Sequence, residues 1–534
     1  MNQRTLKAVI ALLLCVALMC TLFAACNKKS ETPSNNTPSN STPSSTTPDK
    51  TDEGEKPAET TEPETFDEEP TDIIFYMWDM RGTGNDYGDA AKQAAHDYVL
   101  EKINVDVDIN FVNMGDWTTK VAVALSSGER MDVATLFGGL RIAAAYPNNQ
   151  LMDITDLLPV YAPEALEACK DYIGTYTYNG RTFGLPTLRN YSKNGYILFN
   201  GEILNELGLT EQARAIKSWS DYEAVMKAFK EQYGDANGIF ATRGKTGDWI
   251  CNNYVSTGDS FDSFVLFDNL GDGSSVVFTD MDGHVSLYQD QPGWVNEASI
   301  MADWMNKGYV WPDSPFTSEF GDDNMKQKII FSIVTGSEYG VEVTKTNTYG
   351  FECVAVETVT GMIKTSQPVF AGIGVPYTAE EPEAACKFIN LLYSDSTLMN
   401  YLTWGVEGKD YELVDGQVKY GEDSKHYLGV DFIMGNNMLL TPLYGNGVDF
   451  YDKVREINAN ALKSPYMGFS LNLTDLDGVI SQISAVNDQY LGNMQGGGYT
   501  EELYNEYLNK LQAADVQSYL DNVQGQLDAW LANH

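Results

Sequence analysis

Apolar residues switch between strand-like and helix-like spacing in the segment that follows residue 71. The β-rich run 72–78 predicts a first strand, and 105–111, where apolar and polar residues strictly alternate, predicts a second strand with one solvated face. Helical spacing over 87–102 and 117–125 predicts two helices, and 132–137 predicts a third strand. This order is typical of an α/β lobe, in which ligands bind beyond the carboxyl ends of the strands.

A different pattern occupies the N-terminus, where an apolar run over 8–25 follows two cations and closes on Cys26. A charged start, an apolar middle and a small-residue exit are typical of a secretory signal peptide, so we predict that 1–25 is removed. The exit Phe23-Ala24-Ala25-Cys26 resembles a bacterial lipobox, in which the cysteine is lipidated. The alternative is a single membrane-spanning anchor, for which the run is just long enough.

Residues 26–72 contain mainly Ser, Thr, Pro and Glu, with almost no apolar residue before Phe66. Such a segment cannot bury enough surface to offset its ordering entropy, which predicts a disordered tether. A tether behind a lipidated cysteine indicates a protein anchored at the extracellular face of the membrane of a Gram-positive-like bacterium.

Composition limits the partners of the body, which has about 460 residues after the tether and therefore two to three domains' worth of core. The formal net charge of the chain is −40. Nucleic acid and anionic membrane surfaces both need cationic patches, so we exclude them as partners.

Metal and cofactor signals are weak. The four cysteines of the body show no CxxC spacing and no nearby pair of histidines, so zinc is not expected, and their disulfide pairing stays open. Residues 233–239 and 268–273 hint at calcium loops but offer fewer side-chain oxygens than the six to eight ligands that calcium prefers. We predict no metal and no cofactor. The cysteines are Cys169, Cys251, Cys353 and Cys386.

Three segments, 116–120, 126–133 and 149–157, carry short motifs around the third predicted strand. The second motif reads small residue, Gly, acid, two variable positions, Asp and aliphatic, and the third contains a Leu-x-Asp-aliphatic-Thr helix start. Together they resemble the extracellular solute-binding proteins of ABC importers, and within these the family 1, sugar-binding, lipoproteins. The resemblance continues in order at 180–186, 195–200, 206–209, 217–222, 374–376 and 382–389, and residues 407–412, 467–470 and the helix 516–530 resemble an extra C-terminal domain of some members.

The resemblance implies an α/β, two-lobed, periplasmic-binding-protein-like fold with a hinge and a mainly helical C-terminal extension. Its expected parts are lobe one at 73–186 with about 320–395, lobe two at 187–319, and the extension at 396–534, which completes the cleft and the outer surface. The chain is expected to cross between the lobes near Pro186 and Gly374. The implied function is to capture a carbohydrate, expected to be an oligosaccharide, and to deliver it to an ABC permease.

A sugar site requires aromatic platforms for the ring faces and planar polar partners for the hydroxyls. Candidates lie after predicted strands or at predicted crossings, although each such residue, taken alone, is more often structural. The predicted ligand-binding residues are Trp78, Trp249 and Trp404 as stacking platforms, Asp79, Arg189 and Glu407 as hydroxyl partners, and Tyr191 and Glu338 beside them.

Two other classes of function stay open. A secreted carbohydrate-active hydrolase would need two carboxylates at a set separation, and acids are too abundant here to identify such a pair. The sequence contains no GxSxG or HExxH pattern, and its few histidines are scattered, so we predict that the protein is not an enzyme. A binder of peptides or other small solutes is the second alternative.

Overall fold

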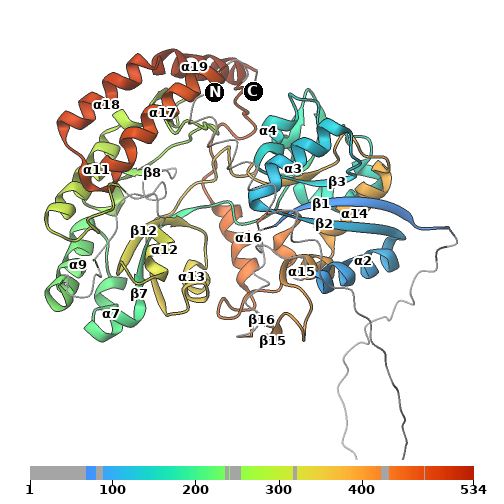
Figure 1. Cartoon of the computed structure of the whole chain (residues 1–534), viewed down its shortest axis with the longest axis horizontal. Helices are drawn as coiled ribbons and strands as arrows, with labels where there is room; N and C mark the ends of the chain where they lie inside the picture. The colour runs from blue at the N-terminus through green and yellow to red at the C-terminus, as the bar shows by residue number, and fades with distance from the viewer. Residues whose placement is uncertain are drawn as a thin grey trace, which may run out of the picture. The chain divides into compact units, whose positions relative to one another are not determined.

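Five strands form the first sheet of the protein, seen beside α3 and α14 in Figure 1. Three of them are parallel neighbours, and the last two are joined through antiparallel pairs. The spatial order is β2 (Val105–Asn113), β1 (Thr71–Asp79), β3 (Val133–Leu136), β14 (Gly372–Gly374) and β6 (Leu185–Pro186). The three strands predicted from the sequence are therefore confirmed.

The computed structural model describes residue 66 and residues 68–79, 88–234, 240, 254–316, 321–421, 432–473 and 476–533. The predicted signal peptide, Cys26 and the tether up to residue 65 lie outside these ranges, as does Trp249. Among the helices in these ranges, none combines the length and the apolarity needed to cross a bilayer.

Helices cover both faces of the first sheet. Successive residues of a strand point to opposite faces. Ile73 and Phe75 of β1 belong to one hydrophobic cluster, whereas Tyr76 and Trp78 belong to another. Burial on both faces explains why 72–78 is a continuous apolar run. The first cluster includes residues of α2 (Asp89–Ile103), α14 (Pro382–Ser394) and α15 (Ser396–Trp404), and the second includes residues of α3 (Met114–Ser127).

A buried carboxylate fastens this sheet to α14. Asp132 Oδ2 accepts hydrogen bonds from the Ile74 backbone N–H and from Arg130 Nε, each at 2.9 Å. Asp132 Oδ1 accepts the backbone N–H groups of Glu380 and Glu381, at 2.8 and 3.1 Å, directly before α14. The Asp of the motif at 126–133 thus joins β1 to the start of a helix that is about 250 residues further along the chain.

The second sheet has three antiparallel strands with β7 in the middle. Its order is β12 (Ser332–Ser337), β7 (Asn194–Asn200) and β13 (Cys353–Val359). Residues 332–359 therefore belong to the same lobe as β7, whereas the sequence analysis expects them in lobe one. The physical reason is that β7 is fully buried and needs a hydrogen-bonding partner along each of its edges.

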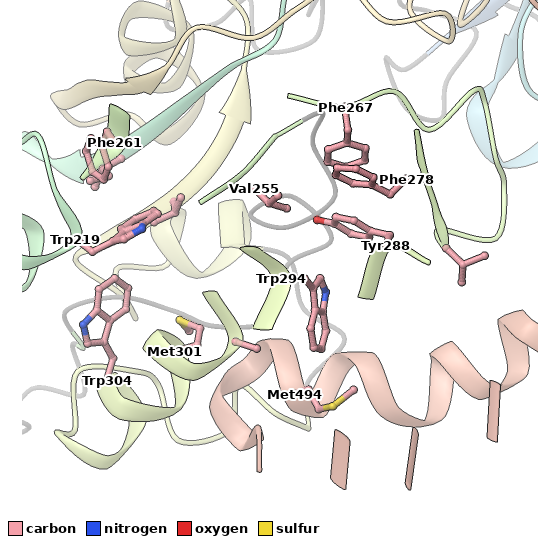
Figure 2. Packing of buried hydrophobic residues seen from close by; sticks show 14 of the residues in the cluster. Trp219, Val255, Phe261, Phe267, Phe278, Tyr288, Trp294, Met301, Trp304 and Met494 are labelled. Carbon is pink, nitrogen blue, oxygen red and sulfur yellow. The ribbon is translucent and has the colours of Figure 1, made fainter. Parts of the chain in front are cut away.

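Aromatic side chains fill the core of the second lobe (Figure 2). Trp219 of α9 (Trp219–Tyr233) meets Phe261 and Trp304 edge to face, with ring centroids 5.0 and 6.0 Å apart. Trp304 and Trp294 both lie on α11 (Pro292–Asn306) and are buried. Trp219 is therefore a core residue.

The C-terminal extension divides between the two lobes. Helices α17 (Asp477–Asn493), α18 (Glu501–Ala513) and α19 (Val516–Leu531) share the core of lobe two, where Tyr504 stacks on Trp294 at 5.8 Å. In contrast, α15 and α16 (Phe450–Asn460) contribute to a core of lobe one. The predicted helical extension and the closing helix at 516–530 are confirmed, and the extension belongs to both lobes.

Three segments connect the lobes, and we refer to them as crossings one, two and three. Crossing one is 187–193, between β6 and β7, and crossing two is 360–371, between β13 and β14. Crossing three is 461–465, between α16 and the lobe-two core residue Tyr466. The expected crossings near Pro186 and Gly374 adjoin the first two.

The carboxyl group of Glu297 is buried in the core of lobe two. Glu297 of α11 accepts the backbone N–H of Ser256 on Oε1 at 2.8 Å, and its Oε2 has no hydrogen-bond partner among the described residues. Burial raises the pKa of this carboxyl well above its usual value, which keeps it protonated in the native state.

Replacing Glu297 with glutamine is expected to flatten the pH dependence of stability. Above its ordinary pKa of 4.5 the carboxyl of the unfolded chain loses its proton while the buried native carboxyl keeps it. The unfolded state then binds fewer protons, so the wild-type free energy of unfolding falls as pH rises from that value towards the raised one. Urea unfolding at about pH 5 and about pH 8 should show that the free energy of unfolding falls more between these pH values for wild type than for Glu297→Gln. Equal falls would contradict this account.

Candidate functional site

A cavity of about 210 Å³ lies where crossing one, lobe two and the extension meet. Crossing one contributes Arg189, Asn190 and Lys193, and the turn after β12 contributes residues between 336 and 344. The remaining wall comes from residues between 432 and 454. No single stretch of the sequence builds this cavity, because its lining comes from three distant segments.

Two stacked rings connect the lobe-two side of the cavity to the extension. Tyr339, after β12, and Phe450, the first residue of α16, lie 5.5 Å apart with an interplanar angle of 21°. Gly340, which follows Tyr339 in the chain, has φ of 86°, and a Cβ on it would lie only 2.6 Å from the Phe450 ring. Glycine is therefore required here both for its backbone conformation and for the close approach of the two segments.

Four aromatic residues pack together and form what we call the aromatic wall, which reaches the cavity lining at Phe432. Its members are Trp78, Phe137, Phe370 and Phe432. The Phe137 ring contacts the rings of Trp78 and Phe370, at centroid distances of 4.5 and 5.3 Å. The centroid of the Phe432 ring lies 6.1 Å from that of Trp78 and 6.1 Å from that of Phe370. Trp78 is only 2% exposed, whereas Phe370 is 37% exposed. Phe370 is therefore the most exposed ring of the aromatic wall, and Trp78 is a buried packing partner of Phe137 and Phe432.

An ion pair joins crossing one to the turn after β12. Arg189 Nη1 donates to Glu338 Oε1 at 2.6 Å, and Arg189 Nη2 donates to Gln367 Oε1 at 3.0 Å. The guanidinium also lies over the Phe370 ring, at 5.2 Å from its centroid. Arg189 therefore links the cavity carboxylate to the aromatic wall.

The other predicted ligand-binding residues occupy different environments. Asp79 ends β1 and is buried beside Trp78. Tyr191 is buried in crossing one, where its hydroxyl donates to the Thr187 carbonyl at 2.7 Å and burial raises the pKa of its phenol well above the ordinary value. Trp404 is 2% exposed within a core of lobe one, and Glu407 is exposed in the loop that follows α15.

Of the predicted residues, Arg189 and Glu338 line the described cavity, and Trp78 is linked to it only through the lining residue Phe432. Trp404 and Glu407 are not among the residues that line this cavity. Trp249 lies outside the described residues, and the assignment of the whole set stays a prediction. Three aromatic residues were missed by sequence reasoning. Phe370 could have been found from its place in a lobe crossing, whereas no strand or motif precedes the other two, Phe432 and Phe450.

Carboxylates of the suspected calcium loop at 268–273 are engaged in hydrogen bonds. Asp272 accepts the backbone N–H groups of Val276 and Val277 at 2.8 and 3.0 Å and the Tyr519 hydroxyl at 2.6 Å. Asp268 accepts the backbone N–H of Thr365 at 2.8 Å. Across the described ranges, no group of three or more His, Cys, Asp or Glu side chains could hold a metal ion.

Three of the four body cysteines, Cys169, Cys353 and Cys386, are buried. Cys251 lies outside the described residues.

Comparison with known proteins identifies relatives over most of the chain. The family described as bacterial extracellular solute-binding protein matches residues 93–406, more than half of the chain. A carbohydrate ABC transporter substrate-binding protein of Streptococcus pneumoniae serotype 4 is 24% identical over 460 residues, which are 82% of this chain and 87% of the relative.

Solved structures agree in fold. The N-glycan transport solute binding protein NgtS of Streptococcus pneumoniae superposes with a TM-score of 0.73 at 22% identity, covering 87% of this chain and 99% of that one. The structure of NgtS in complex with Man1GlcNAc gives a TM-score of 0.66 at 20% identity, covering 86% and 100%. These neighbours confirm the two-lobed fold.

Proposed function

This chain belongs to the family of bacterial extracellular solute-binding proteins, and we propose that it captures an oligosaccharide and delivers it to the permease of an ABC importer. The observation that carries the proposal is the cavity between the lobes, which is lined by the carboxylate of Glu338 and meets the aromatic wall at Phe432 and Arg189. The names of the relatives, which mention carbohydrate and N-glycan transport, support the same ligand class.

The chemistry of the site suits a sugar. A sugar ring presents C–H groups on one face, and the exposed face of Phe370 can cover them. Glu338 uses Oε1 for Arg189, which leaves its second oxygen to accept a ligand hydroxyl. Because the charges of Arg189 and Glu338 offset each other, the pair adds no net charge to the cavity, which favours a neutral oligosaccharide.

A binding role also fits the cavity better than hydrolysis does. Most glycosidases use a pair of carboxyl groups on either side of the scissile bond. Among the described residues that line the cavity, Glu338 is the one carboxylate, and it is held by Arg189. A binder is therefore the simpler reading of this site.

Thermal unfolding in the presence of a panel of neutral oligosaccharides, with peptides as a second panel, tests the proposal. A ligand that binds the native state stabilises it by mass action and so raises the melting temperature. At a ligand concentration of 100 times Kd, the free energy of unfolding rises by about 2.7 kcal/mol. Stabilisation by an oligosaccharide that is recovered intact would support the proposal. Stabilisation by peptides alone, or breakdown of the sugar, would reject it.

Phe370→Ala is expected to weaken binding of that oligosaccharide without a matching loss of stability. Loss of a stacking ring should cost about 2 kcal/mol or more, roughly 30-fold in affinity. Phe316→Ala is the matched control, because Phe316 is 81% exposed and belongs neither to the cavity lining nor to the aromatic wall, whereas Phe370 contacts the lining residues Phe432 and Arg189. Trp404→Ala should instead lower the free energy of unfolding by about 3–5 kcal/mol and leave affinity intact in the folded protein. If Trp404→Ala lost affinity without losing stability while Phe370→Ala kept its affinity, the site would lie near α15.

Ligand binding is expected to close the two lobes over the cavity. Hinge closure around a ligand is a known behaviour of periplasmic-type binding proteins. Small-angle scattering of the mature chain should show a smaller radius of gyration with saturating oligosaccharide than without it. Superimposable curves at a saturation confirmed by calorimetry would count against closure.

Lipid anchoring at Cys26 completes the proposed function, since a permease partner requires the binder to stay at the membrane. In a Gram-positive host, Cys26→Ala is expected to release the protein into the medium, whereas wild type sediments with membranes and carries a mass increase on Cys26. Cys169→Ala is the control, because that thiol is buried within lobe one. A Cys26→Ala protein that still sediments fully with membranes would reject lipidation as the anchor.

A further inference from the structure

We propose that Arg189 is a positioning residue, which couples the cavity carboxylate of Glu338 to all three lobe crossings. This inference rests on the proposed function, because it assigns Glu338 the contact with the ligand. Arg189 itself is 4% exposed, so its role is to hold other groups in place.

Crossing two receives the second end of the guanidinium. Nη2 donates to Gln367 Oε1 at 3.0 Å, and the planar group lies over Phe370. Both partners lie between β13 and β14, in the segment that leads back to lobe one. A movement of the Arg189 side chain would therefore change its contacts with crossing two directly.

Crossing three is reached through the backbone of Arg189. Asn458 of α16 donates from Nδ2 to the Arg189 carbonyl at 2.7 Å and accepts the Tyr191 N–H on Oδ1 at 3.0 Å. These two bonds clamp crossing one to the last turn of α16, and crossing three follows directly. The side chain of Asn458 thus connects crossing one to the helix that leads into crossing three.

The third connection runs to lobe two, through the 2.6 Å bond from Arg189 Nη1 to Glu338 Oε1. Glu338 is held at one oxygen only and faces the cavity. The fork of a guanidinium can bond Glu338 and Gln367 at the same time, which the compact ammonium of a lysine does poorly. A ligand that pulls on Glu338 would therefore act on the crossings through Arg189.

Hydrogen exchange in the unliganded mature chain tests this coupling without any ligand. Glu338→Ala is expected to speed exchange in crossing one, 187–193, and in crossing two, 360–371, by about five- to thirtyfold, the factor for loss of a charged hydrogen bond. Glu352→Ala is the matched control, because this lobe-two glutamate accepts one side-chain hydrogen bond from Asn205, at 3.1 Å, and lies outside the network. Unchanged exchange in both crossings of a folded Glu338→Ala protein would overturn the proposal.

Affinity for an oligosaccharide that stabilises wild type separates positioning from direct contact. If Arg189 acts through Glu338, Arg189→Lys and Glu338→Ala should each lose affinity, and the double variant should lose little more than Glu338→Ala alone. Additive losses would mean that Arg189 touches the ligand itself and would overturn the positioning role. If no sugar binds wild type, the proposed function fails, and the exchange result still decides whether Arg189 couples Glu338 to the crossings.

Discussion

The position of the cavity depends on a short backbone bridge between crossings two and three. Ile363 donates its N–H to the Leu462 carbonyl and accepts the N–H of Ser464, both at 2.8 Å. Ile363 is also buried against Tyr191 of crossing one. The three crossings therefore form one junction of backbone bonds and apolar packing. The cavity walls come from segments on either side of this junction, so their alignment is set there.

Local patterns in the sequence predicted the elements of lobe one well, because its first strands pair with near neighbours in the chain. The Asp of the motif at 126–133 is informative for a physical reason, since Asp132, directly before the central strand β3, satisfies four donors. Such local patterns could not show to which lobe residues 332–359 belong. Strand β12 pairs with β7 across more than 130 residues, and alternation within a strand does not identify its partner.

The candidate site was predictable where a residue follows a strand or begins a crossing, as for Arg189 and Glu338. The same cue selected Trp404, because an aromatic residue beside a glycine looks like a ligand platform. In the structure Trp404 is the last residue of α15 and is buried in the same hydrophobic cluster as Leu398 and Leu402. Phe432 and Phe450 had no such cue, because they reach the cavity only through tertiary packing of the extension.

The division of the extension between the lobes constrains any movement at the cavity. With α16 in lobe one and α17, α18 and α19 in lobe two, crossing three must change whenever the lobes rotate. A rotation must also change crossings one and two, since the bonds of Asn458 and Ile363 tie the three together. Backbone torsions in all three segments must then change in concert, which permits rotation about one axis far more readily than independent motion of each segment. The extension thus acts on the candidate site twice, by supplying Phe450 to the lining of the cavity and by restricting how the two lobes approach each other.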